Sequence, residues 1–262
     1  MTTTLTSSPG STFTRALRGE AIKATSTHTL AISLIATAIV ALLTVAAMSS
    51  MALAFASADE APLADAWGAY GLVLTAIPIL LVWAAHVFFG EVTNGVLRAT
   101  FLAVPQRGTV FLAKGVLAAA VGVAAVVLLV PACHAVYAVI IGQPSALGYV
   151  ITPAGLWAGA RLAFVVACWS FIAVSIAALT RNLALSVGII LVVYLFLEAY
   201  LVDIPGAPWL AYVLPFASGK AVVPELSDVS LPGAGWAALG QLTTTAALVA
   251  AAWWATVRRD VK

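Results

Sequence analysis

The sequence predicts an all-α integral membrane protein with six transmembrane helices. Hydrophobic residues make up 63% of the 262 positions and charged residues only 8%, whereas about a quarter of a soluble domain is charged. Six apolar runs each reach the roughly 20 residues that a helix needs to cross the bilayer. They must be helical because lipid offers no hydrogen-bond partner to the backbone. The runs cover residues 29–56, 69–90, 110–141, 154–179, 184–202 and 234–257.

The N-terminal region precedes these runs and is expected to have two parts. Residues 1–12 are rich in Thr and Ser and are expected to form a disordered tail, followed by a single transmembrane domain at 13–262. In the domain's first turns Phe13 and Leu17 fall on one helical face, while Arg15, Arg18 and Lys23 fall largely on another. This pattern predicts a basic amphipathic helix in the lipid head-group region. The alternative is a solvated tail beside the membrane.

The basic residues predict the orientation of the spans. Ten of the twelve Lys and Arg residues flank the spans on one side, which the positive-inside rule assigns to the cytoplasm. These are Arg15, Arg18, Lys23, Arg98, Arg107, Lys114, Arg181, Arg258, Arg259 and Lys262. The opposite loops carry Asp59, Glu60, Asp65, Asp203, Glu225 and Asp228. Both termini are therefore expected in the cytoplasm. The net charge of +2 is too small to indicate nucleic-acid binding.

The loop between the second and third spans carries a short amphipathic pattern. Apolar residues recur every three or four positions from Glu91 to Val104, and Arg98 falls on another face. Pro105 ends this predicted helix because proline cannot continue it. The next helix is expected to begin near Thr109. A short helix held between two spans could be moved by a soluble partner that binds it. Alternatively, the loop could be a connector whose charges only fix the topology.

The segment at 203–216, between the fifth and sixth runs, is too apolar for an ordinary exposed loop. Three prolines make it too broken to span the bilayer. Trp209 and Tyr212 suit a membrane interface. We expect short re-entrant helices in the outer leaflet here, with an apolar surface loop as the alternative.

Two charges lie inside predicted spans, Arg161 in the fourth and Glu198 in the fifth. Both fall at a similar depth in the outer half, where an unpaired charge is costly. The sequence therefore predicts an intramembrane Arg161–Glu198 pair. The alternative is that each side chain reaches the interface separately.

No residue pattern predicts catalysis. No glycine-rich loop ends in Gly-Lys-Ser/Thr, and His28, His86 and His134 are not spaced as metal ligands. Cys133 and Cys168 fall in apolar runs and are expected to be buried as small hydrophobic residues. The chain is therefore expected to be no enzyme and to hold no metal or cofactor.

The loop after the second span resembles the cytoplasmic loop of the type-2 permeases of ABC exporters. The matching positions are Glu91, Gly95, Arg98, Pro105, Arg107 and Lys114. Val96 departs from the family pattern, since many members carry a small hydroxyl residue there. The resemblance extends from Phe13 to Lys262 and includes the basic C-terminus and the amphipathic N-terminal helix.

This resemblance implies a complex of two permease subunits, as a homodimer or heterodimer, and two copies of an ABC ATPase subunit. ATP and Mg would bind the ATPase, which would contact the Glu91–Lys114 loop and the N-terminal helix. The complex would lie in a bacterial plasma membrane. Spans rich in Ala, Val and Leu suit a hydrophobic or amphipathic cargo, such as a drug, a peptide antibiotic or a lipid. The alternatives are an ion-coupled secondary transporter and a non-catalytic membrane assembly factor.

Overall fold

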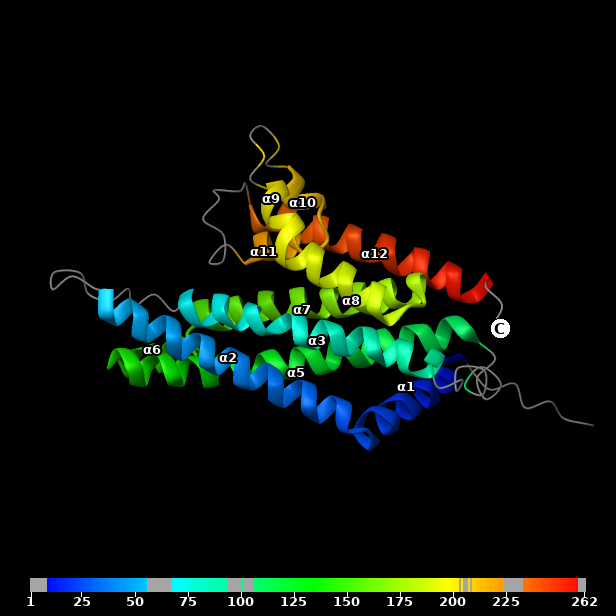
Figure 1. The fold of residues 1–262 in the computed structure, drawn as a ribbon, viewed down its shortest axis with the longest axis horizontal. Helices are drawn as coiled ribbons and strands as arrows, with labels where there is room; N and C mark the ends of the chain where they lie inside the picture. The colour runs from blue at the N-terminus through cyan, green and yellow to red at the C-terminus, as the bar shows by residue number, and fades with distance from the viewer. Residues whose placement is uncertain are drawn as a thin grey trace, which may run out of the picture.

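The computed structural model describes residues 9–55, 67–93, 100, 106–202, 204, 207, 209–223 and 233–258, and those residues form helices without any strand (Figure 1). The all-α prediction is confirmed. The long helices are α1 (Pro9–Ser26), α2 (His28–Phe55), α3 (Trp67–Thr93), α5 (Arg107–Ile141), α7 (Pro153–Thr180) and α12 (Ala234–Arg258). The shorter ones are α6 (Ser145–Tyr149), α8 (Leu183–Val192), the π-helix η1 (Val193–Leu197), α9 (Glu198–Val202), α10 (Leu210–Val213) and α11 (Ala217–Val222).

Four helices are long and apolar enough to cross a membrane: His28–Ala54, Val73–Glu91, Arg107–Ile141 and Pro153–Thr180. These four stretches correspond to the first four predicted spans. The chain is therefore embedded in a membrane and crosses it more than once. The stretch Leu183–Leu197 is apolar but shorter.

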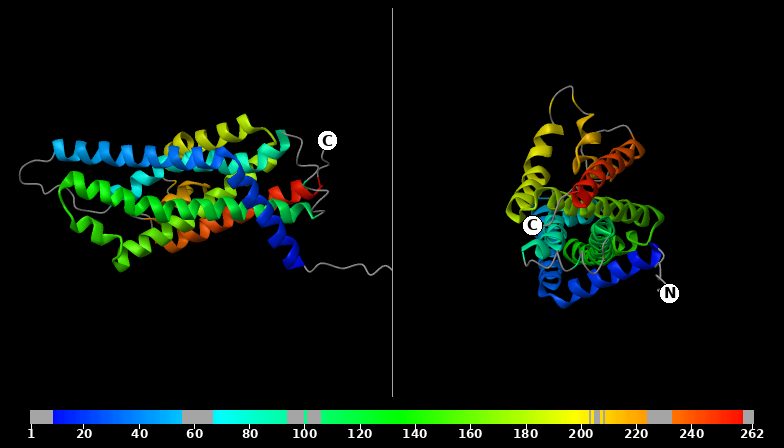
Figure 2. Two further views of the ribbon diagram at one scale, coloured as in Figure 1. Left: turned by 90° about the horizontal axis from the view of Figure 1, so that it is seen from below. Right: turned by 90° about the vertical axis from the view of Figure 1, so that its right-hand side faces the viewer.

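Helix α7 lies at the centre of an elongated bundle. It packs against α5, α3 and α12, and α3 also packs against α2. Helices α1 and α2 lie on one side of the bundle and α8 and α12 on the other (Figure 2). Helix α7 is mostly buried, whereas the outer face of α2 exposes Ile32, Ile35, Ile39 and Leu43. A bundle that turns large aliphatic side chains outward is suited to lipid as its solvent.

Local sequence signals fix the ends of the central helices. Gly142 ends α5 in the left-handed region, with φ 73°, and donates its N–H to the carbonyl of Ala138. Helix α7 begins after Thr152, whose hydroxyl accepts from the Gly155 N–H. Asn182 caps α8 in the same way by accepting from the N–H of Leu185. Helix α7 packs against both α5 and α8; it follows α5 through the short helix α6 and precedes α8 by a two-residue connection.

Helix α1 begins at Pro9, so residues 9–12 of the expected N-terminal tail are helical. It bends away from α2 near Thr27 and crosses α5 (Figure 2). Its buried residues are Ala16 and Glu20. One side of this helix, with Ala16 and Glu20, thus packs on the protein itself, while Phe13 and Leu17 of the predicted apolar face are half-buried.

The segment after α9 contains two short helices: α10 lies within residues 203–216, where the sequence predicts short helices, and α11 follows that range. Proline and an extended Leu214, with ψ 138°, separate α10 from α11. Both helices pack against α12, and α11 also packs against α7 and α9. Five of the six α11 residues are buried. This segment is therefore part of the bundle and no loose surface loop.

Candidate functional site

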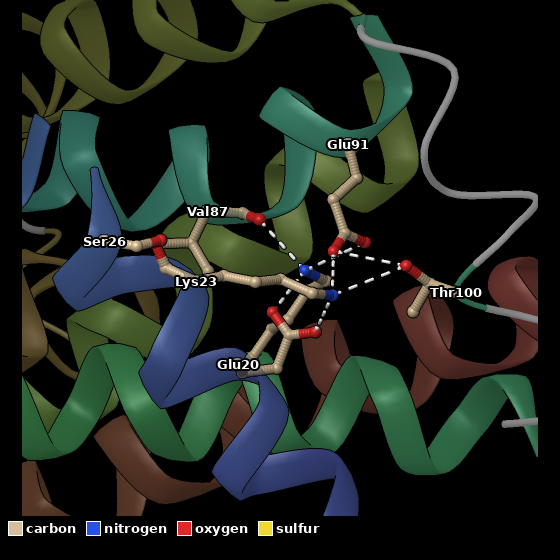
Figure 3. Close-up of polar contacts among 7 residues, drawn as sticks. Glu20, Lys23, Ser26, Val87, Glu91 and Thr100 are labelled. Atoms are coloured by element: carbon tan, nitrogen blue, oxygen red, sulfur yellow. Dashed lines mark hydrogen bonds and ion pairs between the residues drawn. The ribbon is translucent and has the colours of Figure 1, made fainter. Parts of the chain in front are cut away.

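Four charged side chains from three helices meet at the end of α3 (Figure 3). Lys114 of α5 places its Nζ 2.6 Å from Glu20 Oε2 of α1 and 3.1 Å from Glu91 Oε2 of α3. Lys23 of α1 places its Nζ 2.8 Å from Glu20 Oε1 and also contacts Glu91 Oε1. Each carboxylate therefore lies between two ammonium groups, and we call this arrangement the four-charge cluster.

The four-charge cluster is largely removed from solvent. The exposed fraction of the side chain is 1% for Lys114, 4% for Glu20 and 9% for Glu91, but 43% for Lys23. Isolated charges at such depth would be strongly unfavourable, and pairing is what makes their burial tolerable. Two positive and two negative groups leave the cluster neutral. Lys114 also donates to the carbonyl oxygen of Val87 at 3.1 Å.

Lys23 is the cluster member at the surface. Partial burial by itself would lower its pKa, but hydrogen bonds to Glu20 and Glu91 and the attraction of both carboxylates outweigh that effect. The pKa of Lys23 is therefore raised above its ordinary value of 10.5. Lys23 is a permanent cation at physiological pH and binds α1 to the end of α3.

Thr100, which lies between α3 and α5 in the chain, contacts the same cluster. Its Oγ1 lies 3.4 Å from Lys23 Nζ and donates to Glu91 Oε1 at 3.4 Å. The cluster thus joins an N-terminal helix, one end of each of two spans and a residue that lies between those spans in the chain. Ion pairs and hydrogen bonds therefore hold these segments together.

The structure brings together three of the residues that the resemblance assigns to ATPase coupling or to the interfacial helix: Glu91, Lys114 and Lys23. Arg107 lies apart, in a groove between the start of α5 and the end of α12. Phe13 and Leu17 are half-buried on α1, and Arg15 and Arg18 are exposed. Gly95, Arg98 and Pro105 lie outside the described residues, as does most of the expected short helix.

Glu91 belongs to α3 (Trp67–Thr93). The helix of the second span therefore continues through the position at which the sequence predicted a separate short helix to begin. Lys23 and Lys114 both contact the Glu91 carboxylate, so ion pairing stabilises Glu91 at this position.

Sequence reasoning missed Glu20, which completes the cluster. It follows the buried Ala16 by four residues and therefore lies on the face of α1 that packs on the bundle. An acidic residue on the apolar side of a basic helix was the available signal. It indicates a buried cation on another element, here Lys114.

The expected Arg161–Glu198 pair is not what the structure shows. The carboxylate of Glu198 accepts from the Phe216 N–H at 3.0 and 3.1 Å and also from the Ala217 N–H. The guanidinium of Arg161 lies over the Trp157 ring, 5.9 Å from its centroid. Glu198 thus compensates its charge locally, by capping the start of α11, and does not reach Arg161 on α7.

An aromatic cluster surrounds this cap. Trp169, Tyr194 and Phe216 meet edge to face, with ring centroids 5.2 to 5.7 Å apart. Lys220 lies over the Tyr194 ring and donates to the Tyr194 carbonyl oxygen at 3.2 Å. The Tyr194 hydroxyl donates to the Leu74 carbonyl oxygen at 2.9 Å. The π-helix η1 therefore joins α11 to α3 and α7.

Within the described part of the chain no three His, Cys, Asp or Glu side chains gather as metal ligands. His134 is buried, with Nδ1 2.8 Å from the Val130 carbonyl oxygen and its ring stacked on Tyr149. Cys133 and Cys168 are buried free thiols. No protein-family model matches the chain, and no curated protein matches it. The similarity to type-2 permeases therefore remains a prediction from the residues quoted above.

Proposed function

We propose that the chain is the permease subunit of an ATP-driven exporter of the type-2 ABC class, in a bacterial plasma membrane. The four-charge cluster is the observation that carries the proposal. The resemblance assigns ATPase contact to the α3–α5 loop and the N-terminal helix. The cluster joins those two segments through Glu20, Lys23, Glu91 and Lys114.

A coupling element must move as one body when a soluble partner changes shape. Separating a buried ion pair costs about 3–5 kcal/mol when one charge is left unpaired. Helix α1, the end of α3 and the start of α5 therefore resist being pulled apart. A displacement of the α3–α5 segment at Thr100 would therefore move two spans and the interfacial helix together.

Two further helices support six spans. Helices α8, η1 and α9 run without a break over 20 residues, from Leu183 to Val202, which is about 30 Å of helix. Helix α12 has 25 residues, with Trp236 near its start and Trp253 near its end. These tryptophans are about 26 Å apart along the axis, a spacing that suits the two aromatic belts of a bilayer.

The segment from α10 to α11 is proposed to re-enter the outer leaflet. Broken backbone at membrane depth requires partners for its polar groups, because lipid supplies none. Glu198 supplies such partners to the N–H groups of Phe216 and Ala217. Ser218 of α11 likewise donates to Gln241 of α12 at 3.0 Å. By the positive-inside rule, the distribution of basic residues favours a cytoplasmic location for both termini.

The exporter is favoured over an ion-coupled transporter by the environment of Glu198. A coupling carboxylate must exchange its proton or ion during each cycle. Glu198 is held by backbone donors of a short helix, so releasing it would disturb the fold around Phe216. We therefore assign Glu198 a structural role. The cargo proposed from the apolar spans is a drug, a peptide antibiotic or a lipid.

The proposal is tested by purifying the tagged protein from its native membrane in mild detergent and identifying the proteins that co-purify. An ABC ATPase is expected in equal amounts, together with ATP hydrolysis. Glu91→Gln should reduce ATPase recovery, whereas Arg181→Gln, at the α7–α8 connection, should not. Recovery of folded protein without an ATPase, in detergent and in nanodiscs alike, would overturn the proposal.

A further inference from the structure

A groove of about 430 Å³ opens beside the four-charge cluster. It lies between the end of α1, the start of α2 and the last turns of α3. Ala24, Trp83 and Val87 contribute apolar surface to its wall, and Thr27, Thr29 and His86 contribute polar groups. Lys23 is the cluster cation with substantial exposure toward solvent, since 43% of its side chain is accessible.

The position of the groove matches the boundary between lipid chains and head groups. Helix α2 is a membrane-spanning helix that begins at His28, and α1 leaves it at an angle through Thr27 (Figure 2). The groove lies inside this bend, so one side of it faces the apolar part of α3 and the other faces charged and hydroxyl groups. An amphipathic molecule fits such a division better than a fully polar or fully apolar one.

The charges of the groove favour a ligand without net charge. Its charged wall is the neutral four-charge cluster, with two ammonium and two carboxylate groups. An anionic head group would gain attraction from Lys23 but meet Glu20 and Glu91 directly behind it. The Lys23 ammonium already contacts Glu20, Glu91 and Thr100, and both carboxylates are buried behind it. A zwitterionic head group can place its phosphate beside the half-exposed Lys23 and its cation toward the hydroxyl oxygens of the groove.

The hydroxyl groups favour a cation that can donate hydrogen bonds. Thr27 donates its proton to the Ala24 carbonyl oxygen at 3.1 Å, and Ser26 donates to the Lys23 carbonyl oxygen at 2.9 Å. Thr27 Oγ1 also lies 3.0 Å from Thr29 Oγ1, and it accepts from the Thr29 hydroxyl when it donates to Ala24. A hydroxyl oxygen has two lone pairs, so one on Thr27 and two on Ser26 remain as acceptors. A primary ammonium donates hydrogen bonds to such acceptors, whereas a quaternary ammonium does not.

We propose that this groove binds one phospholipid whose head group carries a phosphate and a primary ammonium, as in phosphatidylethanolamine. The head group lies against Lys23, Thr27 and Thr29, and the upper part of one acyl chain lies along Trp83 and Val87. The lipid is a resident ligand that fills the bend between α1 and α2. The inference depends on the membrane location and not on an ATPase partner.

The first test fills the groove without removing a polar group. Gly90 lines the groove, and a Cβ there would meet its nearest atom, His86 Nε2, at 3.5 Å, an ordinary contact. Gly90→Leu should therefore be tolerated and should block the lipid. Gly188→Leu on α8 is the matched control because a Cβ there meets nothing within 4 Å.

The probes are nanodiscs of phosphatidylcholine that contain a minor share of phosphatidylethanolamine or of phosphatidylglycerol, followed by native mass spectrometry of the released protein. One phosphatidylethanolamine should remain bound to the unmodified protein and to Gly188→Leu, and at least about fivefold less to Gly90→Leu, as expected for the loss of one or more ordinary contacts. Equal retention by all three proteins, or preferential retention of the glycerol or choline lipid, would overturn the proposal.

A second pair of variants keeps the test decisive if Gly90→Leu does not fold. Thr27→Val removes a hydroxyl that lines the groove, directly after the end of α1. The control Thr25→Val removes a hydroxyl of α1 that donates to the Ala21 carbonyl oxygen and does not line the groove. Retention of phosphatidylethanolamine should fall severalfold in Thr27→Val alone. An equal fall in both variants, or none in either, would contradict the assignment of the head group to this groove.

Discussion

Lys114 Nζ lies 2.6 Å from Glu20 Oε2, a contact that joins positions 94 residues apart. It anchors α1 to the inside of the bundle through two side chains that are almost completely buried. An amphipathic helix at the membrane surface can be held there by lipid alone. Here a buried ion pair fixes its position on α5, so α1 and α5 are expected to move together.

The first prediction concerns this pair. Glu20→Gln leaves Lys114 with Glu91 alone and should destabilise the fold by about 3–5 kcal/mol, as does removal of one partner of other buried pairs. Lys114→Met should do the same. The double variant retains Lys23 with Glu91 and should lose less than the sum of the single losses. Thermal unfolding in detergent measures all three variants, and additive losses would show that the two groups do not interact.

The second prediction separates the charge of Glu91 from its shape. Glu91→Gln keeps an acceptor for Lys23 and Lys114, so part of the cluster survives. Glu91→Lys places three ammonium groups around Glu20 and should unfold at a clearly lower temperature than the Gln variant. The expected order of melting temperatures is unmodified, Gln, then Lys. Equal melting of the Gln and Lys variants would mean that Glu91 is solvated rather than buried in the cluster.

The apolar pattern of the sequence was sufficient to predict the all-α class and the four helices that qualify as spans, because bilayer thickness sets helix length directly. The position of α1 could not be predicted in this way. Its pattern indicates an apolar face but not whether lipid or protein covers it. Glu20 was the discriminating residue, since a carboxylate on that face requires a cation, and the sequence does not indicate which one.

The contacts of Glu198 show a similar limit when charged side chains are paired from the sequence alone. Arg161 and Glu198 were matched because they are opposite charges at similar depth. Backbone N–H groups at the start of α11 are equally good partners for a carboxylate, and they carry no signal in the amino-acid sequence. Side-chain charges could thus be identified from the sequence, but their compensation by backbone could not.

The third prediction follows from that difference. Glu198→Leu leaves the N–H groups of Phe216 and Ala217 unsatisfied and should destabilise the protein by about 1–3 kcal/mol for each group. Arg161 lies on Trp157 and shares no partner with Glu198 in the described contacts. The Arg161→Leu and Glu198→Leu losses should therefore add within about 0.5 kcal/mol. A double variant that loses less stability than that sum would indicate that Arg161 and Glu198 interact directly.

The fourth prediction concerns the contact between α11 and α7. A Cβ at Gly219 would lie 2.5 Å from Trp169 Nε1 and 2.7 Å from two ring carbons. Because the indole is rigid and buried, Gly219→Ala should cost about 1–3 kcal/mol through overpacking. Gly188→Ala meets nothing within 4 Å on α8 and should instead stabilise its helix by about 0.5–1 kcal/mol. Similar melting of both variants would mean that α11 does not pack on Trp169.

The fifth prediction uses the different exposure of the two lysines. Lys23 is 43% exposed and Lys114 only 1%, so solvent screens Lys23 and its pairs should contribute roughly 0.5–1 kcal/mol. Lys23→Met should therefore melt well above Lys114→Met.

The pKa of Lys23 is raised on folding, so its stabilisation is fully present below the unfolded pKa and is lost as pH rises through the higher folded value. The melting difference between the unmodified protein and Lys23→Met should thus stay constant from about pH 8 to 9.5 and shrink only at more alkaline pH. A difference that already shrinks within that range would show that the carboxylates of Glu20 and Glu91 do not hold the charge of Lys23.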